Sequence, residues 1–223
     1  MLQYHFQFGD VWKYRDMLMG GLVQTIWISI ITIVVSFVIA IVLVFARQYG
    51  PKWLRLLIAT YVELIRNTPF LIQIFLIFFG LPLLGLRFDA NTSGIIAMVA
   101  NSVAYTLEIL RAGIENVGRG QVEAGWALNL NNFRIFRLIV LPQAIRAVAV
   151  PLSTQFILVL LHSSLVAAIA ASELMSTAQI VEARTFRSFE VYLVVLGLYL
   201  ALSLVFSWIL LALRRFTMRW PEA

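Results

Sequence analysis

The sequence has no cysteine, only two histidines and few charged residues. Without cysteine, disulfides, thiol catalysis and thiolate metal sites are excluded. The two histidines, His5 and His162, lie far apart in the chain, and His5 is in a polar N-terminal segment, so a site with several histidines around one metal ion is not expected. Charged residues make up 13% of the chain, about half of the share typical of soluble domains. This composition argues against a water-exposed globular protein.

Long apolar runs take the place of charge. Hydrophobic residues make up 61% of the chain and its mean hydropathy is +0.91. A helix needs roughly 18 to 20 residues to cross the hydrocarbon core. The charge-free runs that reach or nearly reach this length are 17–46, 67–86, 90–107, 147–172 and 191–213. The sequence therefore predicts an all-α integral membrane protein with one transmembrane domain, residues 1–223, and five spans near 20–46, 56–81, 92–114, 143–170 and 191–213.

The N-terminus lacks a basic stretch, a short apolar core and a small-residue cleavage site in series, so the first run is expected to remain as the first span. Orientation follows from the cations, because loops rich in Lys and Arg stay in the cytoplasm. One set of alternate loops holds Arg47, Lys52, Arg55, Arg111, Arg119, Arg134, Arg137, Arg146, Arg214, Arg215 and Arg219. The other set holds Lys13, Arg15, Arg87, Arg184 and Arg187. This bias predicts an external N-terminus and a cytoplasmic C-terminus, and it explains the net charge of +6 without nucleic acid.

The second run contains a break signal at Thr68-Pro69. The residue before proline avoids the helical region, whereas proline suits a first helical turn. We therefore expect a helix that ends near Arg66 and a new one that starts with Thr68 as its N-cap; a simple kink is the alternative. Glu63 and Arg66 are three residues apart, a spacing at which helical side chains can pair.

The stretch 108–146 is too polar for lipid, yet its apolar residues recur at helical spacing. It predicts two short amphipathic helices, joined at Asn129 to Asn132 and ended by Pro142. Such a pair lies on a lipid surface or in a groove of a partner protein, and the pattern alone leaves both open.

Polar residues recur near the middle of the spans, where they are costly and mark pathways. The candidates for a substrate pocket are Thr68, Asn101, Gln155, His162 and Ser163. Gln155 and His162 are seven residues apart, which places them on one helix face. The alternative is that these groups only join helices by hydrogen bonds.

Residues 123–142 resemble the EAA motif of ABC-importer permeases, a cytoplasmic helix pair that docks on the ATPase subunit. The spacing of that motif is met by Glu123, Ala124, Gly125, Asn129, Ile139, Leu141 and Pro142. Two positions depart from it: Gly125 replaces an alanine, and Asn129 replaces a glycine. Asparagine is the common substitute where a left-handed residue is needed, so a helix–turn–helix is still expected.

The resemblance extends to the permeases for polar amino acids. Arg66-Asn67-Thr68-Pro69 looks like their Arg-Gly-Thr-Pro, Gly120-Gln121 matches the run ahead of their docking loop, and Ser163-Ser164-Leu165 is similar to a segment of their fourth span. Some relatives that carry basic amino acids have glutamate at the position of Gln155. A neutral amide offers no charge-assisted bond, so basic substrates are less favoured.

This resemblance implies a type I ABC importer permease fold in a bacterial cytoplasmic membrane, with a coupling loop at 115–142. It also implies two ATPase subunits, a second permease subunit that is the same or a homologous chain, and an external solute-binding protein. ATP and Mg²⁺ would belong to the ATPase; the chain itself has no GxxxxGK[ST] loop and is expected to hold no cofactor or metal. The alternatives are a secondary transporter or channel, which gives no reason for an EAA-like loop, and a membrane-embedded enzyme using His162, Glu63 or Glu108.

Overall fold

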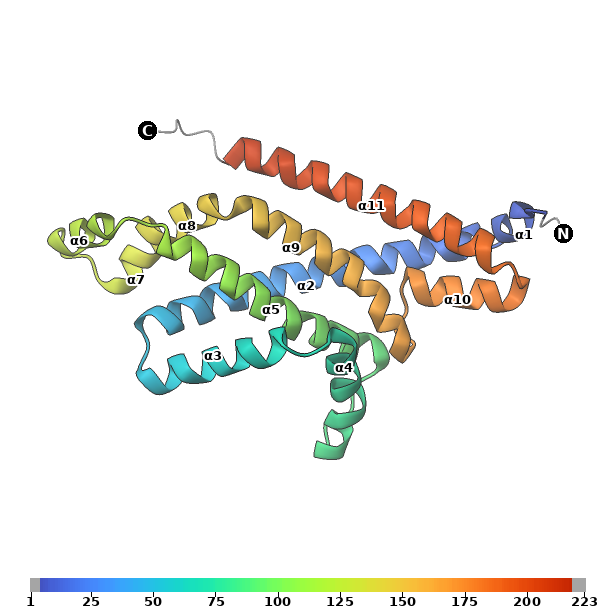
Figure 1. The fold of residues 1–223 in the computed structure, drawn as a ribbon, viewed down its shortest axis with the longest axis horizontal. Coiled ribbons are helices and arrows are strands. Elements are labelled where there is room, and N and C mark those ends of the chain that lie inside the picture. Colours follow the sequence, from blue (N-terminus) through green and yellow to red (C-terminus); the bar gives the residue numbers. More distant parts are fainter. Residues whose placement is uncertain (1–4, 218–223) are drawn as a thin grey trace. The chain divides into compact units, whose positions relative to one another are not determined.

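The structure, a computed structural model, describes residues 5–217, with side chains up to residue 213. Every regular element in this part of the chain is helical (Figure 1). In chain order the elements are α1 (Phe8–Trp12), α2 (Arg15–Tyr49), α3 (Lys52–Arg66), α4 (Phe70–Phe75), η1 (Leu76–Gly80), η2 (Leu81–Leu84), α5 (Ala90–Glu115), α6 (Arg119–Ala127), α7 (Asn132–Ile135), η3 (Phe136–Val140), α8 (Leu141–Ala147), α9 (Ala149–His162), η4 (Ser163–Ile169), α10 (Leu174–Thr185) and α11 (Ser188–Thr217).

Four segments of the described chain are long and apolar enough to cross a membrane: α2, α5, α9 with η4, and α11. A fifth is added if the bent pair Lys52–Arg66 and Phe70–Leu84 forms one span. The predicted break in this pair is observed, because α3 ends at Arg66 and α4 starts at Phe70. The five-span count and the direction of the termini stay predictions. Arg219 and the side chains of Arg214 and Arg215, used in that argument, lie outside the described residues.

The described chain forms two compact units. The first unit comprises 5–32, 71–98 and 157–208; the second comprises 33–70, 99–156 and 209–217. In the first unit, α1, the start of α2, α10 and the start of α11 share an apolar core that includes Val11, Leu18, Leu174, Val181 and Val191. α10 was not expected from the sequence, because its capping box has the reverse of the usual order, with Glu173 at the N-cap and Ser176 at N3.

In the second unit, the end of α2 packs with α3, the end of α5 and the segment from α7 to the first half of α9. Its core includes Val44, Val62, Leu107, Ile135 and Leu152. The side chains of Ser36 and Ser102 are hydrogen-bonded at 2.9 Å in this unit. Polar packing between helices is thus present alongside apolar packing.

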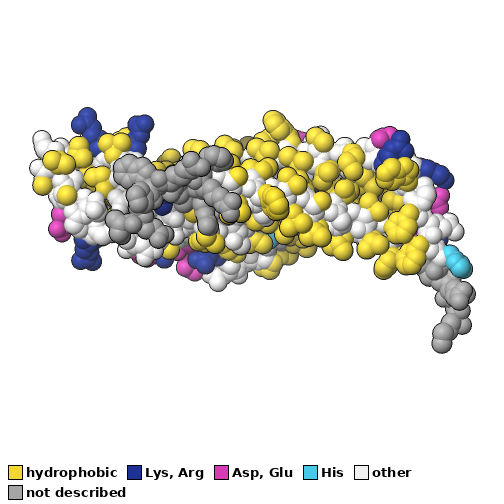
Figure 2. Space-filling view, turned by 90° about the horizontal axis from the view of Figure 1, so that it is seen from above, with side chains coloured by type: hydrophobic (Ala, Val, Ile, Leu, Met, Phe, Trp, Pro, Cys, Tyr) yellow, Lys and Arg dark blue, Asp and Glu magenta, His cyan; other side chains and the backbone are white. Residues whose placement is uncertain are grey.

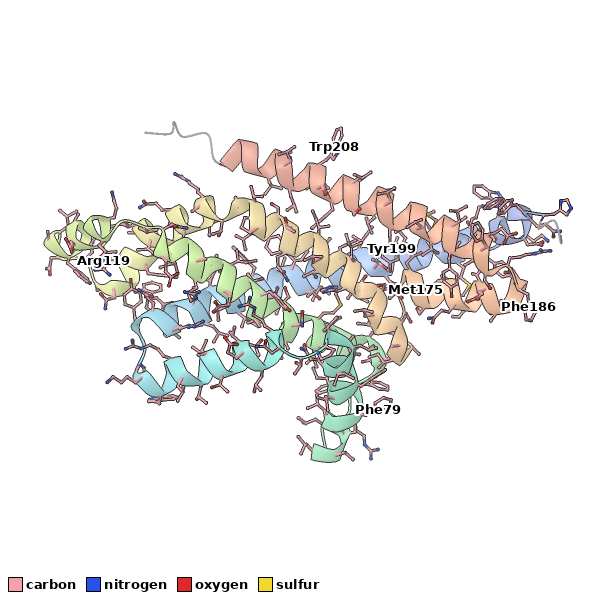
Figure 3. All side chains as sticks on the ribbon, viewed as in Figure 1. Phe79, Arg119, Met175, Phe186, Tyr199 and Trp208 are labelled. Carbon is pink, nitrogen blue, oxygen red and sulfur yellow. The ribbon has the colours of Figure 1, made fainter. Side chains whose placement is uncertain are left out.

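α11 exposes one long apolar face. Leu196, Leu200, Leu204 and Trp208 recur at steps of four and are all exposed. Figure 2 shows hydrophobic side chains spread along this helix, and Figure 3 shows Trp208 pointing away from the ribbon. A helix face of this kind is stable only against lipid or another apolar surface.

Two sequence expectations are wrong. Pro142 does not end the helix after the turn, because a π-helical turn, Phe136–Val140, leads into α8 and places the proline in its first turn, where no N–H is required. Glu63 does not pair with Arg66. Its carboxylate accepts a hydrogen bond from Asn67 Nδ2 at 2.9 Å, while Arg66 Nη1 lies 3.9 Å from Glu108.

Candidate functional site

The turn after α6 is a Schellman motif. Asn129 has φ 57°, in the left-handed region. Its N–H donates to the carbonyl of Trp126 at 2.8 Å, and the N–H of Leu130 donates to the carbonyl of Gly125 at 3.1 Å. These are the two bonds that satisfy the last carbonyls of a helix when a left-handed residue follows it. The expected left-handed role of Asn129 is confirmed.

The next helix is fixed closely against α6. The side chain of Asn131 caps α7 by accepting from the N–H of Arg134 at 2.9 Å. A Cβ on Gly125 would lie 2.8 Å from Cγ1 of Ile135, so the two helices approach more closely than an alanine allows without a shift. The replacement of alanine by glycine in the motif therefore has a local cause. The predicted helix–turn–helix is confirmed.

One side of this pair is buried and the other is uncovered. Ile135, Phe136 and Val140 enter the core of the second unit. The exposed large apolar residues on the pair are Trp126, Leu128, Phe133 and Leu138, of which Leu128 is 74% exposed. Of the residues assigned to the coupling loop, the exposed ones are Gly120, Glu123, Ala124, Asn129 and Pro142; Gly125 is buried, and Ile139 and Leu141 are half-buried. Figure 3 shows Arg119 at the start of α6.

Three residues of the predicted substrate pocket belong to the second unit. Asn101 and Gln155 are buried, with 5% and 6% of their surfaces exposed. No side-chain hydrogen bond is seen between Gln155 and another described residue. Thr68 is exposed, and its hydroxyl donates to the carbonyl of Leu64 at 2.7 Å, which satisfies a carbonyl at the end of α3. Its role as an N-cap for α4 stays a prediction.

The other two residues belong to the first unit. His162 ends α9 and is half-buried, while Ser163 is fully buried and donates to the carbonyl of Leu160 at 2.7 Å. Gln155 and His162 both lie on α9, so their common helix face follows from its geometry. A common pocket for all five residues stays a prediction.

Sequence reasoning missed an ion-pair network around Glu108 in α5. Arg47, at the end of α2, donates to one carboxylate oxygen of Glu108, and Nε of Arg111 donates to the other at 2.9 Å. Arg66 extends the network from α3 and stacks over the ring of Tyr105 at 5.6 Å. Three helices of the second unit are therefore joined by one carboxylate. The sequence signal for this network is that Arg47, Arg66 and Glu108 each stand at the end of a charge-free run.

The same contacts bear on two acid–base candidates of the enzyme alternative, Glu108 and Glu63. Both oxygens of Glu108 are held by guanidinium groups, so this carboxylate is not a free base. Glu63 is bonded to Asn67. Among the described residues no group of three or more metal-binding side chains occurs.

Comparison with known proteins decides between an ABC-importer permease and the alternatives of a secondary transporter, channel or enzyme. Residues 36–219 match the family described as "Binding-protein-dependent transport system inner membrane component". The chain belongs to this family. It is 34% identical to the glutamine transport system permease protein GlnP of Escherichia coli (strain K12), over 94% of this chain and 97% of that protein. It is also 37% identical to the probable glutamine ABC transporter permease protein GlnM of Bacillus subtilis (strain 168), over 86% and 89%.

Solved structures agree in fold. A crystal structure of an amino acid ABC transporter with histidines matches with a TM-score of 0.85 and 32% identity, over 95% of this chain and 99% of that one. An inward-facing structure of the MetNI methionine ABC transporter matches with a TM-score of 0.77 at 19% identity, which supports the fold alone. The type I ABC importer permease fold expected from the EAA-like motif is confirmed, as is membership of the permease family.

Proposed function

We propose that this chain is the transmembrane permease subunit of an ABC importer for amino acids, powered by a separate ATPase subunit. The observation that carries the proposal is the α6–α7 pair, which joins the EAA spacing to an ordered turn and an uncovered apolar side. Its relatives over most of the chain are named as glutamine permeases. The multi-pass membrane location in the bacterial inner membrane follows from the family and from the apolar helices.

The α6–α7 pair transmits movement of the ATPase to the spans. Ile135 and Phe136 are buried in the core shared by α2, α3 and α5, so a displacement of the pair is passed to these helices by packing rather than by a flexible linker. ATP and Mg²⁺ act on the ATPase. The complex contains two ATPase subunits, two permease subunits and an external solute-binding protein that delivers the amino acid.

This assembly requires the α6–α7 pair to face the cytoplasm, with the N-terminus outside. Cysteines placed near Asp89 or Glu182 then react with an impermeant thiol reagent added outside intact cells, and cysteines near Gly50 or Asn131 do not. Native cysteine is absent, so each label reports one position. Labelling with the opposite pattern contradicts the orientation.

The substrate is a polar amino acid, and amino acids with basic side chains are disfavoured. A neutral amide at Gln155 provides both a carbonyl acceptor and an N–H donor, and the side chain is buried in the second unit. Thr68 lies in the same unit as Gln155 and belongs to the proposed pocket. Asn101 lies in the same unit and joins Gln155 in the proposed pocket, while His162 and Ser163 are candidates in the first unit.

Glu123→Lys tests the docking step. Glu123 is exposed on α6, so the change leaves the fold intact while reversing the charge that faces the ATPase. We expect the ATPase to be lost from the purified complex and substrate-stimulated ATP hydrolysis to fall. Glu63→Lys is the matched control, because it makes the same charge change at an exposed position of α3. Wild-type co-purification and hydrolysis with Glu123→Lys would refute the docking assignment.

A further inference from the structure

A basic cavity lies at the elbow between α2 and α3 in the second unit. Gly50 and Pro51 turn the chain there, and Figure 1 shows α3 leaving this turn beside the end of α2. The cavity has a volume of about 500 Å³. Its charged lining consists of Arg47, Lys52, Arg55, Arg111 and Glu115. Four cations thus meet one carboxylate.

The ion pairs at this cavity do not neutralise all of its positive charge. Arg47 and Arg111 share Glu108, and Arg111 also contacts Glu115 at 2.5 Å. Lys52 and Arg55 have no ion-pair partner among the described residues. Even with both carboxylates counted, two cationic side chains remain uncompensated at the cavity.

The backbone adds to this charge. α3 starts at Lys52 without a side-chain hydrogen bond at its N-cap, Pro51. The N–H groups of a helix's first turn carry partial positive charge and favour an anion. Nε of Arg55 donates to the carbonyl of Gly50 at 3.0 Å, which holds this side chain at the elbow and leaves its terminal nitrogens for a ligand.

Apolar surface continues directly from the cavity. Leu56 lines the cavity and is 69% exposed, and Trp53 and Leu57 beside it on α3 are also exposed. The opposite face of α3, with Ile58 and Val62, enters the core. A ligand that fills the cavity and covers this surface needs a compact anion joined to hydrocarbon. Free phosphate meets only the first requirement.

We propose that this elbow binds the headgroup of an anionic phospholipid, with the phosphate in the basic cavity and the acyl chains along Trp53, Leu56 and Leu57. Basic pockets between helices at a membrane surface are suited to such headgroups. The lipid site does not depend on the proposed transport function. The proposed orientation would place it in the cytoplasmic leaflet, and only that placement rests on the transport function. Occupancy would stabilise the contact between α2 and α3.

The test measures lipid binding to the full chain, purified in detergent, by native mass spectrometry. Phosphatidylglycerol and phosphatidylcholine with the same acyl chains are titrated in parallel. We expect the wild type to prefer phosphatidylglycerol and the double variant Lys52→Gln/Arg55→Gln to bind it about 30-fold more weakly, with phosphatidylcholine unchanged. That factor is two cations at about 1 kcal/mol each, converted at 1.4 kcal/mol per tenfold.

Control variants and a competing ligand test whether the binding depends on these two cations, on an intact fold and on a lipid rather than on free phosphate. Lys13→Gln/Arg87→Gln removes two exposed cations from the first unit and is expected to retain the preference. Lys52→Arg keeps the charge and is expected to retain it too, which shows that the elbow tolerates substitution. Equal phosphatidylglycerol affinity in the wild type and the Lys52/Arg55 variant would overturn the site. Displacement of the lipid by inorganic phosphate at equal concentration would overturn the lipid assignment in favour of a simple phosphate site.

Discussion

The N–H of Leu130 donates to the carbonyl of Gly125 across a left-handed Asn129, in the turn that connects α6 to α7. Asn129→Val tests it, because a β-branched residue is strongly disfavoured at φ 57°. A cost of about 1 to 2 kcal/mol per residue corresponds to roughly 5- to 30-fold weaker assembly with the ATPase. Asn129→Gly is the control and is expected to assemble normally. If both variants bind the ATPase equally in a titration, the left-handed turn at Asn129 is not required for docking.

The turn at Asn129 is an example of local structure that could be predicted from the sequence alone. EAA spacing and the asparagine substitution predicted the turn correctly, because both concern backbone conformation within a short segment. Pro142 was misjudged because a π-helical turn absorbs it. The Arg47–Glu108 pair was missed because residues 61 positions apart meet only through the packing of α2 and α5. Spacing along one helix does not reveal such pairs.

Gly21 brings α2 against α10 in the first unit. A Cβ there would lie 2.6 Å from Oγ1 of Thr177 and 3.0 Å from Cα of Leu174, whereas a Cβ on Gly20 has nothing within 4 Å. Gly21→Ala is therefore expected to lower the free energy of unfolding by about 1 to 3 kcal/mol through overpacking, partly offset by higher helix propensity. Gly20→Ala gains the propensity without the clash. Equal thermal stability of the two purified variants would contradict the close approach.

Tyr199 supports a buried carboxylate at the start of α10. Its hydroxyl donates to Glu173 at 2.8 Å, and Figure 3 shows Tyr199 on α11 near Met175. Burial raises the pKa of Glu173 above its ordinary value of 4.5, and hydrogen bonds from Met175 N–H and Tyr199 oppose that rise. Stability contributed through a raised carboxyl pKa is present below the ordinary pKa and is lost as the pH rises through the folded-state pKa.

Tyr199→Phe removes one of those donors, so the pKa of Glu173 rises further and the variant loses more stability at neutral than at acid pH. We expect a cost of about 1 to 3 kcal/mol at pH ~7 that shrinks as the pH falls toward ~4. Tyr192→Phe is the matched control, since Tyr192 donates to Glu182, a partly exposed carboxylate that also accepts from Ser188. Thermal unfolding at several pH values measures both. A Tyr199→Phe cost that is independent of pH would exclude Glu173 as its cause.

Gln155→Ala and Asn101→Ala test the substrate pocket. Each is expected to weaken transport by about 1 to 3 kcal/mol, because a substrate group is left without its partner. ATPase assembly and basal hydrolysis are expected to persist. Thr154→Ala, an exposed neighbour of Gln155 on α9, is the control. If uptake kinetics for acidic, amide and basic amino acids are unchanged in both variants, these groups only pack helices and selectivity resides in another subunit.

The central claim is that this chain forms the amino-acid pathway of an ATP-driven importer. The direct measurement is uptake of a panel of radiolabelled amino acids into vesicles that contain the purified permease, with its ATPase subunits and binding protein added or withheld. The account predicts that a polar amino acid accumulates against a gradient only when ATP, the ATPase and the binding protein are all supplied, and that this uptake is lost with Glu123→Lys. Uptake by the permease alone, driven by an ion gradient without ATP, would contradict it and identify a secondary transporter.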